Sequence, residues 1–235
     1  MGFIVSPEDE LAQLKQDFEE FAYIVSHDLK APVRAINNLS MWIEEDLGDQ
    51  IPEDVQQNMQ LLRNRAMRME RMIEALLQFS RVNRSELEIN KVDTAVLLQE
   101  VKAKLPKPDA VALEVLPSLP TFKTYGAKLE RVFTHIISNA YTFAQKPVTT
   151  IQVAVKEEEG FYRFSFADNA QGMPAEALKK IFKLFYTVAP KDTVDTCGAG
   201  LAITKKIVQF VGGKIEAMQN QMGGTTLTFT WPKAL

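Results

Sequence analysis

An apolar repeat in the first third of the chain is the feature that most constrains its fold. Between Val55 and Leu76, apolar residues alternate at spacings of four and three, and the repeat ends at Ser80. Its members are Val55, Met59, Leu62, Ala66, Met69, Ile73 and Leu76. This spacing predicts a helix with one continuous apolar seam. The methionines of the segment are interpreted as packing residues of that seam.

A second apolar stripe precedes the first, from Leu11 to Leu47. Its members recur three or four residues apart: Leu11, Leu14, Phe18, Phe21, Val25, Leu29, Val33, Ile36, Leu39, Ile43 and Leu47. Between the stripes, a helix-ending Gly48 is followed by Pro52, which favours a helix start. The pattern predicts an antiparallel hairpin of two long helices. Because one hairpin cannot bury both stripes, we expect two copies of the chain to form a homodimer, as a four-helix bundle.

The pattern changes to mixed strands and helices after residues 83–92. Alternating apolar and polar residues predict short strands at 88–92, 111–115, 150–155, 161–167, 214–218 and 225–231. Helical spacing is found at 93–104, 126–143, 175–182 and 202–211. The order of these segments predicts a second domain that is an α+β sandwich, with helices on one face of a mixed sheet.

Composition limits the classes of function open to the chain. The formal net charge of -3 gives no electrostatic argument for nucleic-acid binding. The single cysteine, Cys197, cannot form a disulfide within the chain and is typical of a reducing compartment. No apolar stretch approaches the roughly 20 residues that span a bilayer, and no signal peptide is recognisable. We therefore expect a cytoplasmic protein.

One of the two histidines, His27, stands in the first predicted helix and is followed by Asp28. It lies two residues from both Val25 and Leu29 of the apolar stripe, so it points about 200° away from each and is expected to face solvent. Imidazole can accept a proton or a phosphoryl group near neutral pH, and an adjacent carboxylate can orient it. Pro32 is expected to loosen the helix one turn further on. The alternative is a surface histidine without a chemical role.

Several segments, taken in order, carry a resemblance to a known family. They are residues 21–26, the box His-Asp-Leu-Lys-Ala-Pro at 27–32, Asn139, Asp168, residues 182–185 and residues 198–200. In these segments the chain resembles a sensor histidine kinase, of the phytochrome-like branch. Residues 8–86 resemble the dimerisation and histidine phosphotransfer domain. Residues 92–235 resemble the catalytic ATP-binding domain of the Bergerat, or GHKL, fold.

The resemblance implies a set of site residues for ATP and Mg²⁺. Asn139 would ligate Mg²⁺ through its amide oxygen, and Asp168 would accept a hydrogen bond from the adenine amino group. Gly172 would give the loop beside the base its backbone freedom. Gly198 and Gly200 would let backbone N–H groups at a helix start approach the phosphates. Taken alone, the same residues also fit a helix surface and ordinary turns.

The resemblance also implies a reaction. His27 would take the γ-phosphoryl group of ATP, with Asp28 as base or orienting partner, and pass it to an aspartate of a separate response regulator receiver domain. Residues 182–185 would hinge a lid that covers ATP and extends over residues 186–196. A sensory domain is expected upstream of this chain.

Four positions depart from the family pattern: His135, Thr142, Ala170 and Thr196. His135 replaces a frequent asparagine, Thr142 a lysine, and Ala170 and Thr196 each a glycine. These departures leave a second hypothesis open, a degenerate kinase that acts as a dimeric signalling scaffold. A third, a chaperone or other ATPase of the same fold, is disfavoured because such proteins lack the box around His27.

Overall fold

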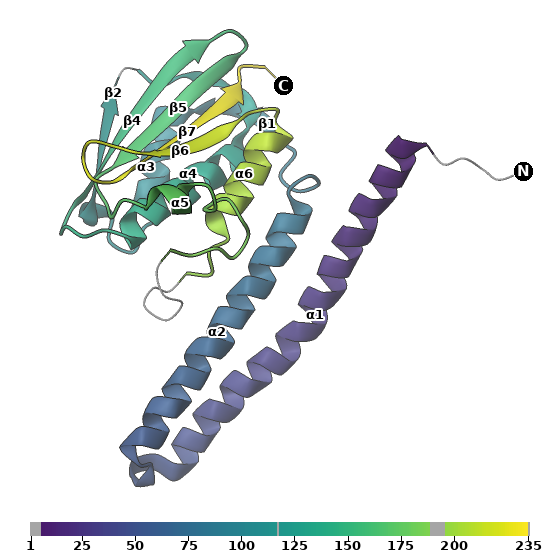
Figure 1. Cartoon of the computed structure of the whole chain (residues 1–235), viewed down its shortest axis with the longest axis vertical. Helices are drawn as coiled ribbons and strands as arrows, with labels where there is room; N and C mark the ends of the chain where they lie inside the picture. The colour runs from purple at the N-terminus through teal and green to yellow at the C-terminus, as the bar shows by residue number, and fades with distance from the viewer. Residues whose placement is uncertain (1–5, 117, 189–195, 235) are drawn as a thin grey trace, which may run out of the picture. The chain divides into compact units, whose positions relative to one another are not determined.

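The computed structural model describes residues 6–116, 118–188 and 196–234, and the chain forms two compact units, with the first ending at Arg81. The first unit is a helical hairpin, built from α1 (Pro7–Leu47), the short 3-10 helix η1 (Gly48–Gln50) and α2 (Glu53–Arg81). Figure 1 shows the two long helices antiparallel, with η1 between them. The predicted hairpin is confirmed.

Helix α1 begins with a capped N-terminus. Ser6 Oγ accepts a hydrogen bond from the N–H of Asp9 at 3.1 Å, and Pro7 lies in the first turn, where its missing N–H costs nothing. The helix runs through Pro32 and ends at Gly48, whose φ of 50° is easily adopted by glycine. Pro32 therefore lies inside a continuous helix rather than at its end.

The hairpin buries a narrower seam than the apolar stripes predict. The buried residues of its two helices are mostly small or polar: Ala22, Ser26, Val33 and Ser40 in α1, and Ala66, Ile73, Ala75 and Ser80 in α2. Most of the predicted α1 stripe is exposed, including Leu14 at 65% and Phe21 at 61%. This exposure agrees with the expectation that one hairpin does not bury both stripes, because two helices alone cover only one side of each other.

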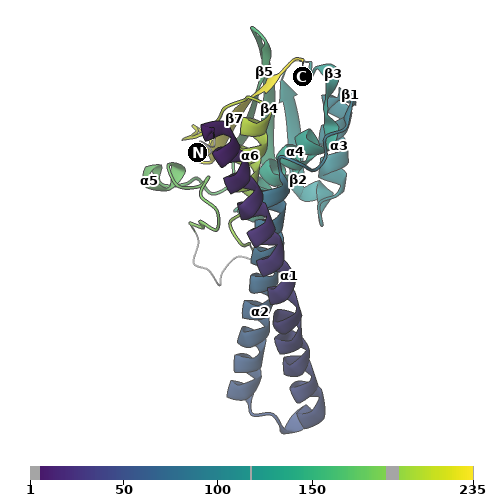
Figure 2. The same ribbon diagram turned by 90° about the vertical axis from the view of Figure 1, so that its right-hand side faces the viewer.

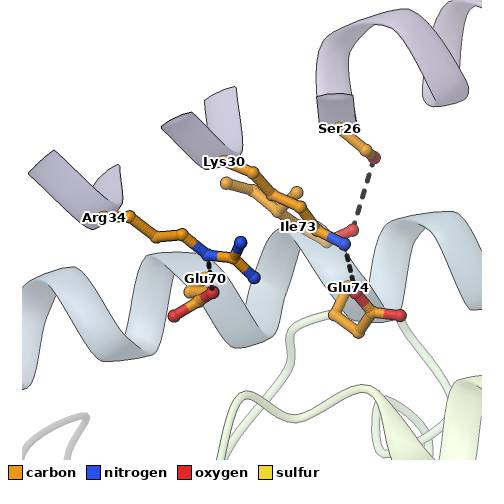
Figure 3. Close-up of polar contacts among 6 residues, drawn as sticks. All are labelled: Ser26, Lys30, Arg34, Glu70, Ile73 and Glu74. Carbon is orange, nitrogen blue, oxygen red and sulfur yellow. Dashed lines mark hydrogen bonds and ion pairs between the residues drawn. The ribbon is translucent and has the colours of Figure 1, made fainter. Parts of the chain in front are cut away.

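Polar side chains link the two helices beside this seam, as Figure 3 shows. The links are Ser26 Oγ to the carbonyl oxygen of Ile73 at 3.3 Å, Lys30 Nζ to Glu74 Oε2 at 2.5 Å, and Arg34 Nε to Glu70 Oε1 at 2.7 Å. The three α1 residues are spaced four apart, so they lie along one side of the helix. Exposed ion pairs add little stability, but this series matches only one register of α1 against α2.

A five-stranded mixed sheet forms the frame of the second unit. Its order is β2-β4-β5-β7-β6, with β2 parallel to β4 and the other neighbours antiparallel. The strands are β2 (Val111–Leu116), β4 (Thr149–Glu158), β5 (Phe161–Asp168), β6 (Ile215–Gln219) and β7 (Thr225–Pro232). A separate antiparallel pair consists of β1 (Ile89–Asp93) and β3 (Thr121–Tyr125).

Helices cover one face of this sheet, as the view in Figure 2 shows for α3 and α4. The helices of the unit are α3 (Thr94–Ala103), the 3-10 helix η2 (Pro108–Ala110), α4 (Gly126–Thr142), α5 (Ala175–Leu178) and α6 (Gly200–Phe210). The ring of Phe133 on α4 lies 5.6 Å from Phe164, 5.3 Å from Phe166 and 6.4 Å from Phe229. These rings are fully or almost fully buried and form the core. The predicted sandwich is confirmed.

Two elements of the second unit differ from the prediction. Strand β3 was missed, because Thr124, one of its two buried residues, is polar and weakens the apolar alternation. The helix predicted at 175–182 was too long, since α5 ends at Leu178 and the chain continues in turns. Phe185, a few residues on, has a φ of 63°, which no right-handed helix accommodates.

The predicted lid at 186–196 falls partly outside the described residues, since residues 189–195 are not among them. Within the ranges that the structure does describe, no helix combines the length and the apolar character that crossing a membrane requires.

One buried hydrogen bond between the sheet and β3 allows a direct stability test. Trp231 Nε1–H donates to Thr124 Oγ1 at 2.7 Å, and both residues are fully buried. Thr124→Val keeps the shape but leaves the indole N–H unpaired, so we expect it to lower the free energy of unfolding by about 1–3 kcal/mol. Chemical denaturation followed by circular dichroism measures this. Thr124→Ser, which keeps the hydroxyl, is the control. Equal stability of the Val variant and the parent would contradict the prediction.

Candidate functional site

His27 is exposed, as the sequence predicts, with 75% of its side chain accessible. Its Nδ1 lies 3.0 Å from Asp28 Oδ1, and the Asp28 side chain is also exposed. A carboxylate can only accept, so this hydrogen bond places the ring proton on Nδ1 and leaves the lone pair on Nε2. The arrangement presents one defined nitrogen of the ring as a nucleophile.

The residues on either side of His27 anchor the helix that carries it. Ser26 is buried and donates to the carbonyl oxygen of Ile73, and Lys30 pairs with Glu74 (Figure 3). One turn before His27, the ring of Tyr23 lies 6.3 Å from the imidazole. The exposed imidazole is thus carried by a segment of α1 that is linked to α2 on either side of it.

In the second unit, Asp168 ends strand β5 and is 7% exposed. Its Oδ1 accepts hydrogen bonds from the N–H of Ala170 at 3.0 Å and of Thr225 at 3.1 Å. Its own carbonyl oxygen accepts from Asn220 Nδ2 at 2.8 Å. Burial raises the pKa of the Asp168 carboxyl, and the two N–H donors partly oppose that change. Within the described residues the other carboxylate oxygen, Oδ2, accepts no hydrogen bond, so it can accept one from a ligand.

Two glycines near Asp168 are required for space rather than for unusual backbone angles. A Cβ on Gly224 would lie 2.2 Å from the Asp168 carbonyl oxygen and 2.4 Å from Oδ1. A Cβ on Gly172 would lie 2.5 Å from the carbonyl oxygen of Gly223. Gly172 was predicted to supply backbone freedom, but neither Gly172 nor Gly224 has a positive φ. The loop after β5 and the turn before β7 approach each other too closely for any side chain.

Two buried hydroxyl groups near the ends of strands have no partner in the described part of the chain. They are Thr149 Oγ1 on β4 and Thr225 Oγ1 on β7, and both residues are at most 2% exposed. The backbone N–H of Thr225 donates to Asp168 Oδ1, so Thr225 lies next to that carboxylate. A buried hydroxyl without a partner is costly, which favours a ligand atom or a bound water there. The sequence reasoning missed both; the Gly-Gly-Thr run at 223–225 was the available signal.

Helices α4 and α6 bring two further predicted residues together. Asn139 is half-buried near the end of α4, and its side-chain amide makes no hydrogen bond within the described ranges. Four residues earlier, His135 lies against Gly200, the first residue of α6, where a Cβ would be 3.6 Å from the imidazole ring. The carbonyl oxygen of Phe143, just after α4, accepts from the N–H of Gln171 at 3.1 Å. The end of α4 therefore joins the start of α6 to the loop after Asp168.

Gly198 is placed differently from Gly200. It has a φ of 72°, and a Cβ there would lie 2.4 Å from the carbonyl oxygen of Tyr186. Phe182 and Phe185, the predicted hinge, are half-buried and lie outside the aromatic core, and Lys205 Nζ lies 5.7 Å from the centroid of the Phe182 ring. The plain core-packing interpretation of these phenylalanines is therefore weakened.

The departures from the family pattern have different structural consequences. Ala170 is buried and its N–H still donates to Asp168, so alanine is compatible with this turn. Thr142 is exposed at the end of α4 and supplies no cation. His135 is half-buried and hydrogen-bonded to Thr204, so it is not an exposed residue of the helix surface.

Comparison with known proteins gives two family matches. Residues 19–85 match the His Kinase A (phospho-acceptor) domain. Residues 125–235 match the histidine kinase-, DNA gyrase B-, and HSP90-like ATPase. The first match falls mainly on the hairpin and the second on the sheet unit.

Individual relatives agree with these matches. Over 98% of its length the chain is 31% identical to Cyanobacterial phytochrome B of Nostoc sp., of which it covers 32%. It is 27% identical, again over 98% of its length, to Sensor protein kinase WalK of Staphylococcus aureus, of which it covers 58%. The chain therefore spans about a third of the length of the phytochrome. The structure of full-length ShkA in complex with AMPPNP has a TM-score of 0.63 at 22% identity, covering 90% of this chain and 45% of ShkA.

The close approach of Gly224 to Asp168 leads to a stability prediction. Gly224→Ala places a methyl group against backbone atoms that cannot move aside, so we expect a loss of about 1–3 kcal/mol in the free energy of unfolding. Gly200→Ala is the matched control, because its Cβ would make an ordinary contact and its φ is not positive. Scanning calorimetry of both variants measures the difference. A Gly224→Ala variant as stable as Gly200→Ala would contradict the close packing.

Proposed function

The chain belongs to the histidine kinases, with a phospho-acceptor domain followed by an ATPase domain, and from this premise we propose that ATP bound in the second domain phosphorylates His27. The observation that carries the proposal is the exposed imidazole whose Nδ1 is bound to Asp28. The phosphotransfer domain is assigned to residues 8–86 and the catalytic domain to residues 92–235.

The proposed chemistry is the transfer of a phosphoryl group from ATP to His27. His27 Nε2 forms a bond to the γ-phosphorus, and the bond from that phosphorus to the ADP oxygen breaks. The imidazole becomes cationic as the new bond forms, and Asp28 stabilises that charge or accepts the Nδ1 proton. The phosphohistidine then transfers its phosphoryl group to an aspartate of a response regulator receiver domain, which regenerates neutral His27.

The adenine site is assigned to Asp168 and its neighbours. The free carboxylate oxygen of Asp168 accepts a hydrogen bond from the adenine amino group, which guanine cannot offer because it carries a carbonyl there. The unpartnered hydroxyl of Thr225 supports this assignment, since it supplies a second polar group in the same buried place. Gly172 lies in the loop beside the base.

The phosphate side of the site is assigned to α4 and α6. We assign the backbone N–H groups at Gly198 and Gly200 to the phosphate oxygens, because the N-terminal end of a helix dipole favours their negative charge. Asn139 would hold Mg²⁺ through its amide oxygen, and when bound the ion would neutralise phosphate charge. No cluster of three or more histidine, cysteine or acidic residues able to hold a metal exists within the described ranges. A single amide ligand fits a magnesium ion that is held mainly by the phosphates and water.

The exposed apolar residues of the hairpin support a homodimer. Phe21, Leu29, Leu39 and Trp42 on α1 are all between two-fifths and two-thirds exposed. Surfaces of this kind are rare on monomers, and pairing two hairpins into a four-helix bundle would bury them. Since the proposed partners are ATP and a receiver domain, we propose that the reaction takes place in the cytoplasm. We propose that the sensory part of the protein corresponds to the portion of its relatives that this chain does not span.

Phosphorylation of His27 is tested with γ-labelled ATP and Mg²⁺. We expect label that is acid-labile and alkali-stable in the parent chain and absent from His27→Gln. In Asp28→Asn we expect the labelling rate to fall at least tenfold, because the imidazolium loses its carboxylate. Both variants should bind ATP as the parent does, since neither residue lies in the ATPase domain.

The same assay separates the alternatives. Label on the His27→Gln variant would place the acceptor elsewhere. A parent chain that binds ATP but takes no label would overturn the proposal in favour of the signalling scaffold.

Adenine recognition is tested with Asp168→Asn. The amide oxygen can still accept from Ala170 and Thr225, which leaves the NH₂ group facing the adenine amino group, donor to donor. We expect ATP affinity to fall at least tenfold, and the preference for ATP over GTP to shrink. Isothermal titration calorimetry measures both ligands, with Asp109→Asn, an exposed carboxylate of the same domain, as the control.

The stability of this variant should not fall. A raised pKa means that ionisation of Asp168 is less favourable in the folded than in the unfolded chain. The contribution of Asp168 to the free energy of unfolding is therefore fully present below the ordinary carboxyl pKa. It is lost as the pH rises through the raised pKa of the folded chain. Asparagine has no charge to bury, so at neutral pH the variant should be at least as stable as the parent. Unchanged ATP affinity would contradict the assignment of Asp168.

A further inference from the structure

His135 is a half-buried histidine that the proposed reaction does not use. It lies on α4, and its Nδ1 is 3.1 Å from Thr204 Oγ1 on α6. Thr204 is fully buried, and the imidazole ring also packs against Gly200 at the start of α6. The contact thus joins the middle of α4 to the first turn of α6 through one side chain on each helix.

The hydrogen bonds of Thr204 fix which nitrogen of His135 carries the proton. Thr204 Oγ1 donates its one proton to the carbonyl oxygen of Gly200 at 2.9 Å. Toward His135 it can then only accept, so both contacts are satisfied at once only when Nδ1 of the imidazole carries a hydrogen. The result is a short chain of donors that runs from His135 through Thr204 to Gly200.

The ring is suited to remain neutral in this role. Burial lowers the pKa of His135 to about 4, and the positive charge of Arg131, one turn earlier on α4, acts in the same direction. A neutral ring puts no additional positive charge beside Arg131.

The position of His135 connects the two halves of the phosphate site. Asn139, the proposed Mg²⁺ ligand, lies four residues later on α4 and therefore on the same side of that helix. Gly200 opens the helix proposed to face the phosphates. A tie between His135 and the first turn of α6 sets the distance between the metal ligand and the phosphate-binding backbone.

We infer that His135 is a positioning residue, which holds the start of α6 at a fixed place relative to Asn139 through its hydrogen bond to Thr204. The inference rests on the proposed ATP site, and it concerns only the phosphate half of that site. It follows that loss of the bond weakens binding of the triphosphate and the metal but leaves the adenine half intact.

The test compares Mg-ATP with adenosine, which has no phosphates, in the full chain. We expect His135→Leu and Thr204→Val each to weaken Mg-ATP binding about three- to tenfold, the range for one lost hydrogen bond, with adenosine binding unchanged. The double variant should be no weaker than Thr204→Val alone, because that variant has already lost the bond to His135. His135→Asn should retain affinity within about twofold, since its side-chain NH₂ stands where Nδ1–H stood.

A ¹⁵N spectrum of the labelled chain tests the tautomer without any activity. The chain has only two histidines, and His27→Gln identifies their signals. We expect His135 to be neutral at pH 7 with its proton on Nδ1, and Thr204→Val to change that signal. A proton on Nε2, or a charged ring at pH 7, would overturn the inference. So would equal losses of adenosine and Mg-ATP affinity, which would indicate a general structural role. Failure of His27 to become phosphorylated leaves these measurements unaffected.

Discussion

The Asp168 carboxylate is the point on which the second domain's site depends. A buried carboxylate at the end of a central strand is tolerated only where donors meet it, and here two backbone N–H groups do so. Those donors come from segments far apart in the sequence, the loop after β5 and the start of β7. Gly224 allows the two to meet, because any side chain would collide with Asp168. The carboxylate thus organises both the loop after β5 and the turn before β7.

The two helices of the hairpin are held together by weaker interactions. Its inner seam consists of small residues such as Ala22 and Ala66, which let α1 and α2 approach closely but bury little apolar surface. Polar links such as that between Lys30 and Glu74 contribute little stability, but they favour one register of α1 against α2. The larger apolar side chains are left outside, which fits a helix pair that is completed by a second copy. His27 stands apart from both surfaces, and so stays accessible.

Much of this arrangement was predictable from local pattern, and the remainder depended on contacts between distant residues. Periodicity predicted both long helices, the β4–β5 hairpin and the exposure of His27, because each depends on neighbours in the sequence. Strand β3 was missed since its buried Thr124 is matched to Trp231, more than a hundred residues away. Thr225 was missed for a similar reason, because its importance comes from Asp168.

The two histidines, His27 and His135, differ in their surroundings, and these surroundings favour different roles for the same side chain. In both, a partner at Nδ1 determines the tautomer, Asp28 for His27 and Thr204 for His135. The partner of His27 is a carboxylate in solvent, which supports a ring that becomes positively charged during reaction. The partner of His135 is a buried hydroxyl, and burial opposes any charge on that ring. The first environment favours a nucleophile and the second a fixed neutral donor. In the proposed ATP site, His135 is therefore compatible with kinase chemistry without taking part in it.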